Sequence, residues 1–243
     1  MTSKILRGAA VLEEGFSVKV LPEGEALCVL GTSLTLVDVS QCEIRARIAA
    51  GWRLFWSMRE LLLNRRSALK SRMKLLDSTV GSCVLWCTES WTPRAEEARL
   101  LRSARRSMLR RVVGVGKLPD EDYLEWIVRA TRRAESFADT AGVRDWYKAH
   151  LSAKWSWAGH VARSAPSKWV ARVSTWRNSE WQLLAEDAGG SRPLRPSRRR
   201  WMKWEDSIRR YCAMHGHRFW MVFAQGRDEW TSEKHGFVEW SEA

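Results

Sequence analysis

The sequence lacks the short motifs that identify common phosphate-handling and hydrolytic enzymes. It has no Gly-Lys-Ser/Thr end to a glycine-rich phosphate loop, no Gly-x-Ser-x-Gly nucleophile elbow and no His-Glu-x-x-His zinc pair. Its 28 acidic residues are outnumbered by 41 Lys and Arg and are scattered along the chain. Because two-metal phosphoryl transfer needs clustered carboxylates, we expect no polymerase or nuclease site in this chain alone.

Long hydrophobic runs are also missing. Residues 1–10 contain no hydrophobic segment of a signal peptide, and no stretch approaches the roughly 18 apolar residues of a membrane span. The five cysteines are odd in number. We therefore expect an intracellular chain with free thiols and no membrane partner.

Tyr and Phe are scarce, at 3 and 6 residues, whereas 16 residues are Trp. The formal net charge is +13, and most of the positive charge comes from Arg. A planar guanidinium binds phosphate in bidentate geometry, and a strongly basic protein attracts polyanions. These features predict RNA and/or DNA as partners. The alternative is a charged surface that serves solubility.

The first 40 residues have the pattern of short strands, and the rest has the period of helices. Strands are predicted over 17–21, 26–30 and 33–39, separated by Gly and Pro. Helices are predicted over about 41–64, 67–87, 92–114, 121–138, 143–163 and 169–186, with two more after residue 200. The fold class is therefore mainly α, with a small N-terminal β-hairpin or strands, then a helical bundle and further C-terminal helices.

Three details of these helices follow from local signals. Ser40 with Glu43 has the spacing of a capping box and predicts the first helix start. The helix over 121–138 is expected to turn Leu124, Ile127, Val128 and Ala134 inward. Residues 231–243 are expected to be frayed.

Composition divides the chain into five regions. They are a β segment over 1–40, a helical region over 41–118, a Trp-rich helical region over 119–188, a basic Pro/Gly/Arg linker over 189–200 and a C-terminal helical segment over 201–243.

Two basic clusters are candidate nucleic-acid contacts, because each neutralised phosphate releases counterions. The first is the arginine-rich helix face of Arg99, Arg102, Arg105, Arg106, Arg110 and Arg111; the second contains Arg198, Arg199, Arg200 and Lys203. The alternative for both is a solvated surface. Trp201 and Trp204 near the second cluster have a spacing that suits base stacking, but core packing is the better interpretation.

A zinc site is the weaker interpretation of the Cys and His residues. Cys212, His215 and His217 have the spacing of half a site, and Cys83 with Cys87 could complete it. Cys83 and Cys87 lie among apolar residues of a predicted helix, where Cys is an ordinary small core residue. We therefore predict no metal site.

Several segments, in order, resemble the thumb and downstream region of LINE-type (non-LTR) retrotransposon reverse transcriptases. The resemblance covers about 30–230. It rests on VLGTSLTLVDV (29–39), on 43–63 and 70–91, on RLLRSARRSMLRRVVGV (99–115), on KWSWAGHVAR (154–163), and on 192–210 and 219–230. One departure is Trp86-Cys87, where the family commonly has Tyr-Gly.

The resemblance implies a thumb-like bundle over 41–118 and a primer-grip-like turn at Leu30, Gly31 and Thr32. The family's catalytic aspartates lie in an Ala-Asp-Asp box of the palm, just upstream of this turn, and no such box is present. The chain is therefore expected to begin after the palm, with no catalytic residue and no cofactor, although the complete RNA-directed DNA polymerase would use Mg²⁺. The expected partners are RNA and/or DNA and a missing palm and fingers portion. The sequence does not fix a location within the cell, and the resemblance is compatible with the nucleus.

Two alternatives remain open. The chain could be a basic Trp/Arg-rich helical protein-interaction module with no nucleic-acid role. It could also be a polymerase subunit that the palm of another chain completes.

Overall fold

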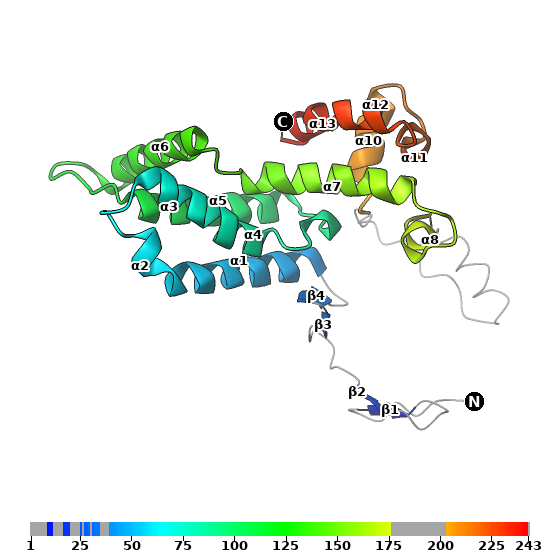
Figure 1. The fold of residues 1–243 in the computed structure, drawn as a ribbon, viewed down its shortest axis with the longest axis horizontal. Helices are drawn as coiled ribbons and strands as arrows, with labels where there is room; N and C mark the ends of the chain where they lie inside the picture. The colour runs from blue at the N-terminus through cyan, green and yellow to red at the C-terminus, as the bar shows by residue number, and fades with distance from the viewer. Residues whose placement is uncertain are drawn as a thin grey trace. The chain divides into compact units, whose positions relative to one another are not determined.

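A computed structural model describes residues 9–11, 17–19, 25, 27–29, 31–34, 39–175 and 203–242 (Figure 1). The described part is mainly helical, which confirms that the fold class is mainly α. The chain divides into two compact units, a first unit of residues 1–87 with 93–144 and a second unit of 88–92 with 145–243. The five composition regions stay a prediction, and the linker over 189–200 lies outside the described residues.

The N-terminal segment contains four three-residue strands. β1 (Ala9–Val11) pairs with β2 (Ser17–Lys19), and β3 (Leu27–Val29) pairs with β4 (Thr32–Leu34), both antiparallel. Gly31 lies between β3 and β4 with φ of +80°, a conformation that favours glycine. The predicted strand over 33–39 is wrong at its end, because Val39 already belongs to a helix.

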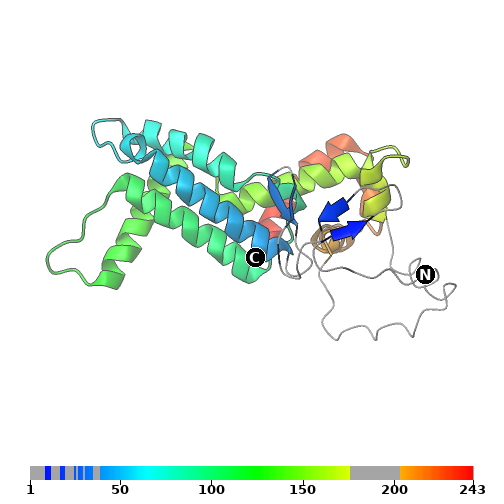
Figure 2. The same ribbon diagram turned by 90° about the horizontal axis from the view of Figure 1, so that it is seen from below.

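The first unit is a helical bundle. Its elements are α1 (Val39–Ser57), α2 (Arg59–Leu62), α3 (Leu69–Leu76), a π-helical turn η1 (Asp77–Gly81), α4 (Ser82–Val84), α5 (Ala95–Val113) and α6 (Tyr123–Ala141). α1 and α5 run side by side (Figure 2), and α5 also packs against α3 and α6. The core between them contains buried Phe55, Leu62, Met73, Leu101 and Met108.

Helix ends in this unit follow local chemistry more closely at α5 and α6 than at α1. The backbone N–H of Arg94 donates to Glu97 before α5, and Asp122 caps α6. Gly114 and Gly142 end these two helices in the left-handed conformation. The predicted cap at Ser40 is wrong, because α1 begins one residue earlier and Ser40 lies inside it.

The inward face predicted for α6 is also wrong in part. Leu124 is 67% exposed and Val128 is 46% exposed, whereas Ala130, Ala134, Ala138 and Ala141 are buried. A stripe of alanines lets α6 approach α5 closely, since small side chains keep the helix axes near each other. The hydrophobic periodicity therefore indicated the face beside the true one.

The second unit contains η2 (Thr88–Ser90), α7 (Trp146–Ala162), α8 (Trp169–Thr175), α10 (Asp206–Met214), α11 (Trp220–Phe223), α12 (Arg227–Ser232) and α13 (Lys234–Glu242). Its core is built on two tryptophans. The rings of Trp155 and Trp230 stack with centroids 3.8 Å apart, and each indole N–H donates to the other residue's carbonyl, at 2.7 and 3.0 Å.

The expected fraying of residues 231–243 is wrong for the described part of that segment. Phe237 of α13 is fully buried and stacks on Trp155 at 4.7 Å between centroids. Glu242 pairs with Lys148 of α7 at 3.0 Å. These contacts fix the C-terminal helix against α7, since burial of an aromatic ring outweighs the tendency of a chain end to fray.

Candidate nucleic-acid interface

The arginines predicted on 99–111 all lie on α5, but they do not form one solvated face. Arg99, Arg106 and Arg111 are exposed, Arg102 and Arg110 are partly buried, and Arg105 is only 5% exposed. The helical period explains the split, because residue 105 falls on the same side as the buried Leu101, Met108 and Val112. Arg102 makes interactions of its own within the fold.

Arg105 has a structural role. Its Nε–H donates to the carbonyl of Arg144 at 2.9 Å, and its Nη2 donates to the carbonyl of Val143 at 3.4 Å. These carbonyls follow the C-terminal end of α6, where backbone acceptors lack helical partners. Arg105 therefore does not belong to the exposed phosphate-binding face in which the sequence placed it.

Arg106 and Arg110 extend from α5 towards α6. Arg106 forms an ion pair with Glu135 at 2.8 Å, and an Nη1–H of Arg110 donates to Thr131 at 2.9 Å. Partial burial, followed by the neighbouring charge of Arg111, lowers the pKa of Arg110. Both side chains are thus held in fixed directions, although the carboxylate of Glu135 offsets part of the Arg106 charge.

Arg111 extends the other way, towards α1. Its guanidinium carbon lies 5.0 Å from the ring centroid of Trp52 and 5.9 Å from that of Trp56. Its Nη1 donates to both the carbonyl and the hydroxyl of Ser107, at 3.1 and 2.6 Å. Sequence reasoning assigned no role to these two tryptophans. The signal was present in the pair of Trp residues four apart on one helix.

Other arginines of the first unit hold loops and helix ends. Buried Arg72 donates to the carbonyls of Leu62, Ser67 and Val112, and exposed Arg65 donates to the carbonyl of Gly114 at 3.1 Å. Burial, and then the charge of Arg65, lower the pKa of Arg72. The arginines of the first unit therefore include side chains that donate to backbone carbonyls within the fold as well as side chains that reach solvent.

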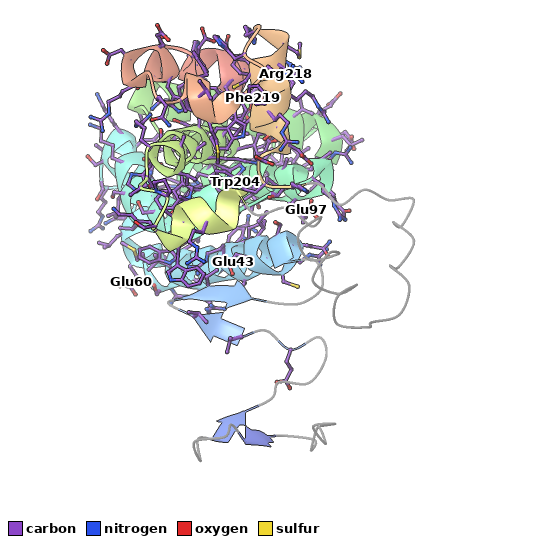
Figure 3. The ribbon with its side chains drawn as sticks, turned by 90° about the vertical axis from the view of Figure 1, so that its right-hand side faces the viewer. Glu43, Glu60, Glu97, Trp204, Arg218 and Phe219 are labelled. Atoms are coloured by element: carbon purple, nitrogen blue, oxygen red, sulfur yellow. The ribbon has the colours of Figure 1, made fainter. Side chains whose placement is uncertain are left out.

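The acidic residues of α1, α2 and α5 are few. Glu43 lies on α1, Glu60 on α2 and Glu97 at the start of α5 (Figure 3). Glu43 pairs with Arg47 at 2.6 Å. Glu96 and Glu97 occupy the first turn of α5, whereas Arg110 and Arg111 occupy its last turn. The C-terminal half of α5 is consequently the more positive part of the helix.

The turn predicted as primer-grip-like lies close to α1. A Cβ on Gly31 would lie 3.7 Å from both Arg47 Nη2 and Trp86 Nε1, and β4 contacts α1. Gly31 is exposed and Thr32 begins β4. Leu30 lies outside the described residues.

The second basic cluster belongs to the second unit. Arg198, Arg199 and Arg200 lie outside the described residues, as does Trp201. Lys203 is exposed, and its backbone N–H donates to Asp206 at 2.8 Å. Trp204 is partly buried and donates to the carbonyl of Glu89 at 2.7 Å (Figure 3), so its role is packing.

The second unit also buries two basic side chains on α7. The Nδ1 of His150 lies 2.8 Å from the carbonyl of Thr88, so Nδ1 carries the proton. Burial, with the nearby Lys154, lowers the pKa of His150 to about 3, and burial lowers the pKa of Lys154 to about 8. The Lys154 ammonium lies 5.7 Å from the ring centroid of Trp204. These groups are packed in the core and do not face solvent.

Metal ligands are not gathered anywhere in the described part of the chain, where no group of three or more His, Cys, Asp or Glu could hold an ion. Cys83 and Cys87 belong to the first unit, and Cys212, His215 and His217 belong to the second. Burial raises the pKa of Cys212 to about 12, which keeps its thiol protonated.

The helices that the structure describes include none with the length and apolar character needed to cross a bilayer.

Comparison with known proteins gives one distant relative. A Caenorhabditis elegans protein described as an uncharacterized transposon-derived protein is 26% identical over 221 residues, which cover 89% of this chain and 72% of that protein. No protein-family model matches the chain, and no solved structure gives a significant match. The chain is thus a distant homologue of a transposon-derived protein and has a transposon-related origin.

Proposed function

From this transposon-related origin, we propose that the chain is a fragment of a LINE-type reverse transcriptase, formed by its thumb and downstream regions, that binds the backbone of RNA or DNA. The transposon-derived relative supports the origin. The mainly helical fold agrees with the helical bundle that the resemblance implies. Several sequence segments resemble LINE-type reverse transcriptases and occur in the same order along the chain, and they are the basis for proposing this enzyme class.

The observation that carries the binding function is the exposed guanidinium row on α5. Arg99 and Arg106 reach solvent seven residues apart on one side of α5, and partly buried Arg110 lies on the same side. Arg111 reaches solvent on the other side, towards α1. A row of fixed guanidinium groups releases the counterions of a phosphate backbone, and this release provides affinity without base specificity. The two acidic residues of α5 lie in its first turn, where the helix dipole favours negative charge, so they do not neutralise the arginines further along the helix.

The remaining parts of the proposal follow from the family resemblance. The bundle of α1 to α5 acts as a thumb beside the template–primer backbone, and the turn at Leu30, Gly31 and Thr32 is primer-grip-like. Lys203 and the arginines at 198–200 provide a second set of phosphate contacts. The fragment needs no cofactor for this binding, whereas polymerisation would require a palm and fingers portion and Mg²⁺.

The test is a charge-neutralising double substitution on the exposed row. Arg99→Gln with Arg106→Gln should weaken binding of a fluorescent RNA or DNA duplex about 5- to 30-fold at low salt, since each lost phosphate contact removes one counterion-release contribution. Arg218→Gln with Arg227→Gln removes two exposed charges from the second unit and is the matched control. Equal affinity of both double variants would contradict a role for the α5 row.

The second candidate function is a protein-interaction module, favoured by the exposed apolar residues of α6. Tyr123, Leu124 and Val128 are 59, 67 and 46% exposed on one helix. Exposed apolar patches mark interaction sites in many soluble proteins. Polynucleotide affinity that the α5 substitutions do not change would favour this candidate.

A further inference from the structure

The α1 and α5 surfaces meet at a cluster of two indoles and one guanidinium. Trp52 and Trp56 stack with centroids 6.1 Å apart and an interplanar angle of 22°. Trp56 is 48% exposed, whereas Phe55 beside it is fully buried and holds the Trp56 ring edge-on at 5.2 Å. The guanidinium of Arg111 lies over both indoles. We call Trp52, Trp56 and Arg111 the indole platform.

The platform is ordered by contacts on its protein side. Two hydrogen bonds to Ser107 hold the Arg111 guanidinium, and the Phe55 ring supports both indoles from the core. An exposed ring in a fixed direction binds a planar ligand with little loss of conformational entropy. The platform therefore has the preorganised form of a stacking site and differs from a loosely placed surface tryptophan.

The charge around the platform selects the ligand. Arg111 belongs to the last turn of α5, and the two Glu residues of α5 are in its first turn. The single acid of α1, Glu43, pairs with Arg47, and the exposed Glu60 of α2, four residues after Trp56, is preceded by Arg59. A planar aromatic group linked to negative charge fits this combination of a half-exposed indole and a cation, and a nucleobase with its phosphate is such a group.

We propose that the indole platform takes one unpaired base of a single-stranded RNA or DNA segment by stacking on Trp56, with Arg111 beside the adjoining phosphate. This inference rests on the proposed backbone-binding function and adds a preference to it. The bases inside a duplex already stack on each other, so a duplex presents phosphates but no free base face. The fragment should therefore bind a single strand, or a duplex with an overhang, more tightly than a blunt duplex.

The test compares Trp56→Ala with a matched tryptophan substitution on two probes. Anisotropy should show about a tenfold loss for an oligothymidylate of roughly 12 nucleotides and less than about a twofold loss for a blunt duplex, because stacking of one base contributes affinity on this order. Trp157→Ala is the control, since Trp157 is 38% exposed and stacks on His160 in the second unit. Trp56→Phe keeps an aromatic face and should retain most of the single-strand affinity.

Photocrosslinking locates the contact directly. An oligonucleotide with iodouracil should crosslink to the tryptic peptide of residues 54–59, which contains Trp56, more than to the peptide of residues 48–53, which contains Trp52. Equal losses on both probes, or no loss with Trp56→Ala, would overturn the platform. If the Arg99 and Arg106 substitutions still weaken duplex binding in that case, the backbone function stands without it.

Discussion

Individual arginines of α5 have different tasks although they are adjacent in the sequence. Arg105 is buried and holds the carbonyls of Val143 and Arg144, whereas Arg99 is exposed and Arg111 lies over two indoles. The composition predicted a basic helix correctly. The composition did not reveal that Arg105 points inward. A guanidinium can occupy a buried position where it donates to the backbone carbonyls that follow a neighbouring helix. The presence of a basic helix was thus predictable from the sequence, whereas the burial of each arginine was not, and the binding role of these residues stays a prediction.

This division predicts that the same Arg-to-Gln substitution changes stability strongly at one position and hardly at the other. Arg105→Gln should lower the free energy of unfolding by about 2–4 kcal/mol, because it leaves the buried carbonyl of Val143 and the part-buried carbonyl of Arg144 without their charged donor. Arg99→Gln should change it by less than about 0.5 kcal/mol, since Arg99 is exposed. Urea denaturation followed by circular dichroism measures both. A neutral effect of Arg105→Gln would show that the carbonyls of residues 143 and 144 do not depend on that side chain.

At the scale of elements, the predicted end of the third helix at Gly114 agrees with the end of α5, whereas the predicted cap at Ser40 was wrong. The cap at Asp122 and the end of α6 at Gly142 were not predicted. The core face of α6 was misread because alanine contributes little to a hydrophobic pattern, yet a row of alanines permits the close approach of α6 to α5. α13 was missed because its stability comes from contact with Trp155, which is distant in the sequence.

Close approach of elements gives a prediction for the second unit. A Cβ on Gly159 of α7 would lie 2.6 Å from Nε1 and 2.7 Å from Cδ1 of Trp230. Gly159→Ala should therefore destabilise the protein by roughly 1–3 kcal/mol, although alanine is favoured in an isolated helix by about 1 kcal/mol. Thermal unfolding is the measurement. Ser156→Ala, on an exposed position of the same helix, is the control, and a stabilised Gly159→Ala protein would contradict the Trp155–Trp230 packing.

At the scale of the whole molecule, the positive charge divides between fold and surface. Arg72 and Arg105 are buried and donate to backbone carbonyls. Arg65 and Arg144 also donate to backbone carbonyls but are exposed, and Arg144 binds Asp77 at 3.0 Å. The net charge of +13 includes buried and exposed side chains alike. Charge that is fixed inside the fold still attracts a polyanion at a distance, but only the exposed groups replace counterions in a complex.

The salt dependence of polynucleotide binding is the most direct test of the backbone-binding proposal. For the complete chain, log K plotted against log salt between about 50 and 200 mM should fall with a slope of roughly −2 to −5, as expected when several guanidinium groups neutralise phosphates. The Arg99→Gln and Arg106→Gln double variant should have a shallower slope by about 1–2. A slope near zero, or no binding of RNA and DNA at the lowest salt, would contradict the proposal.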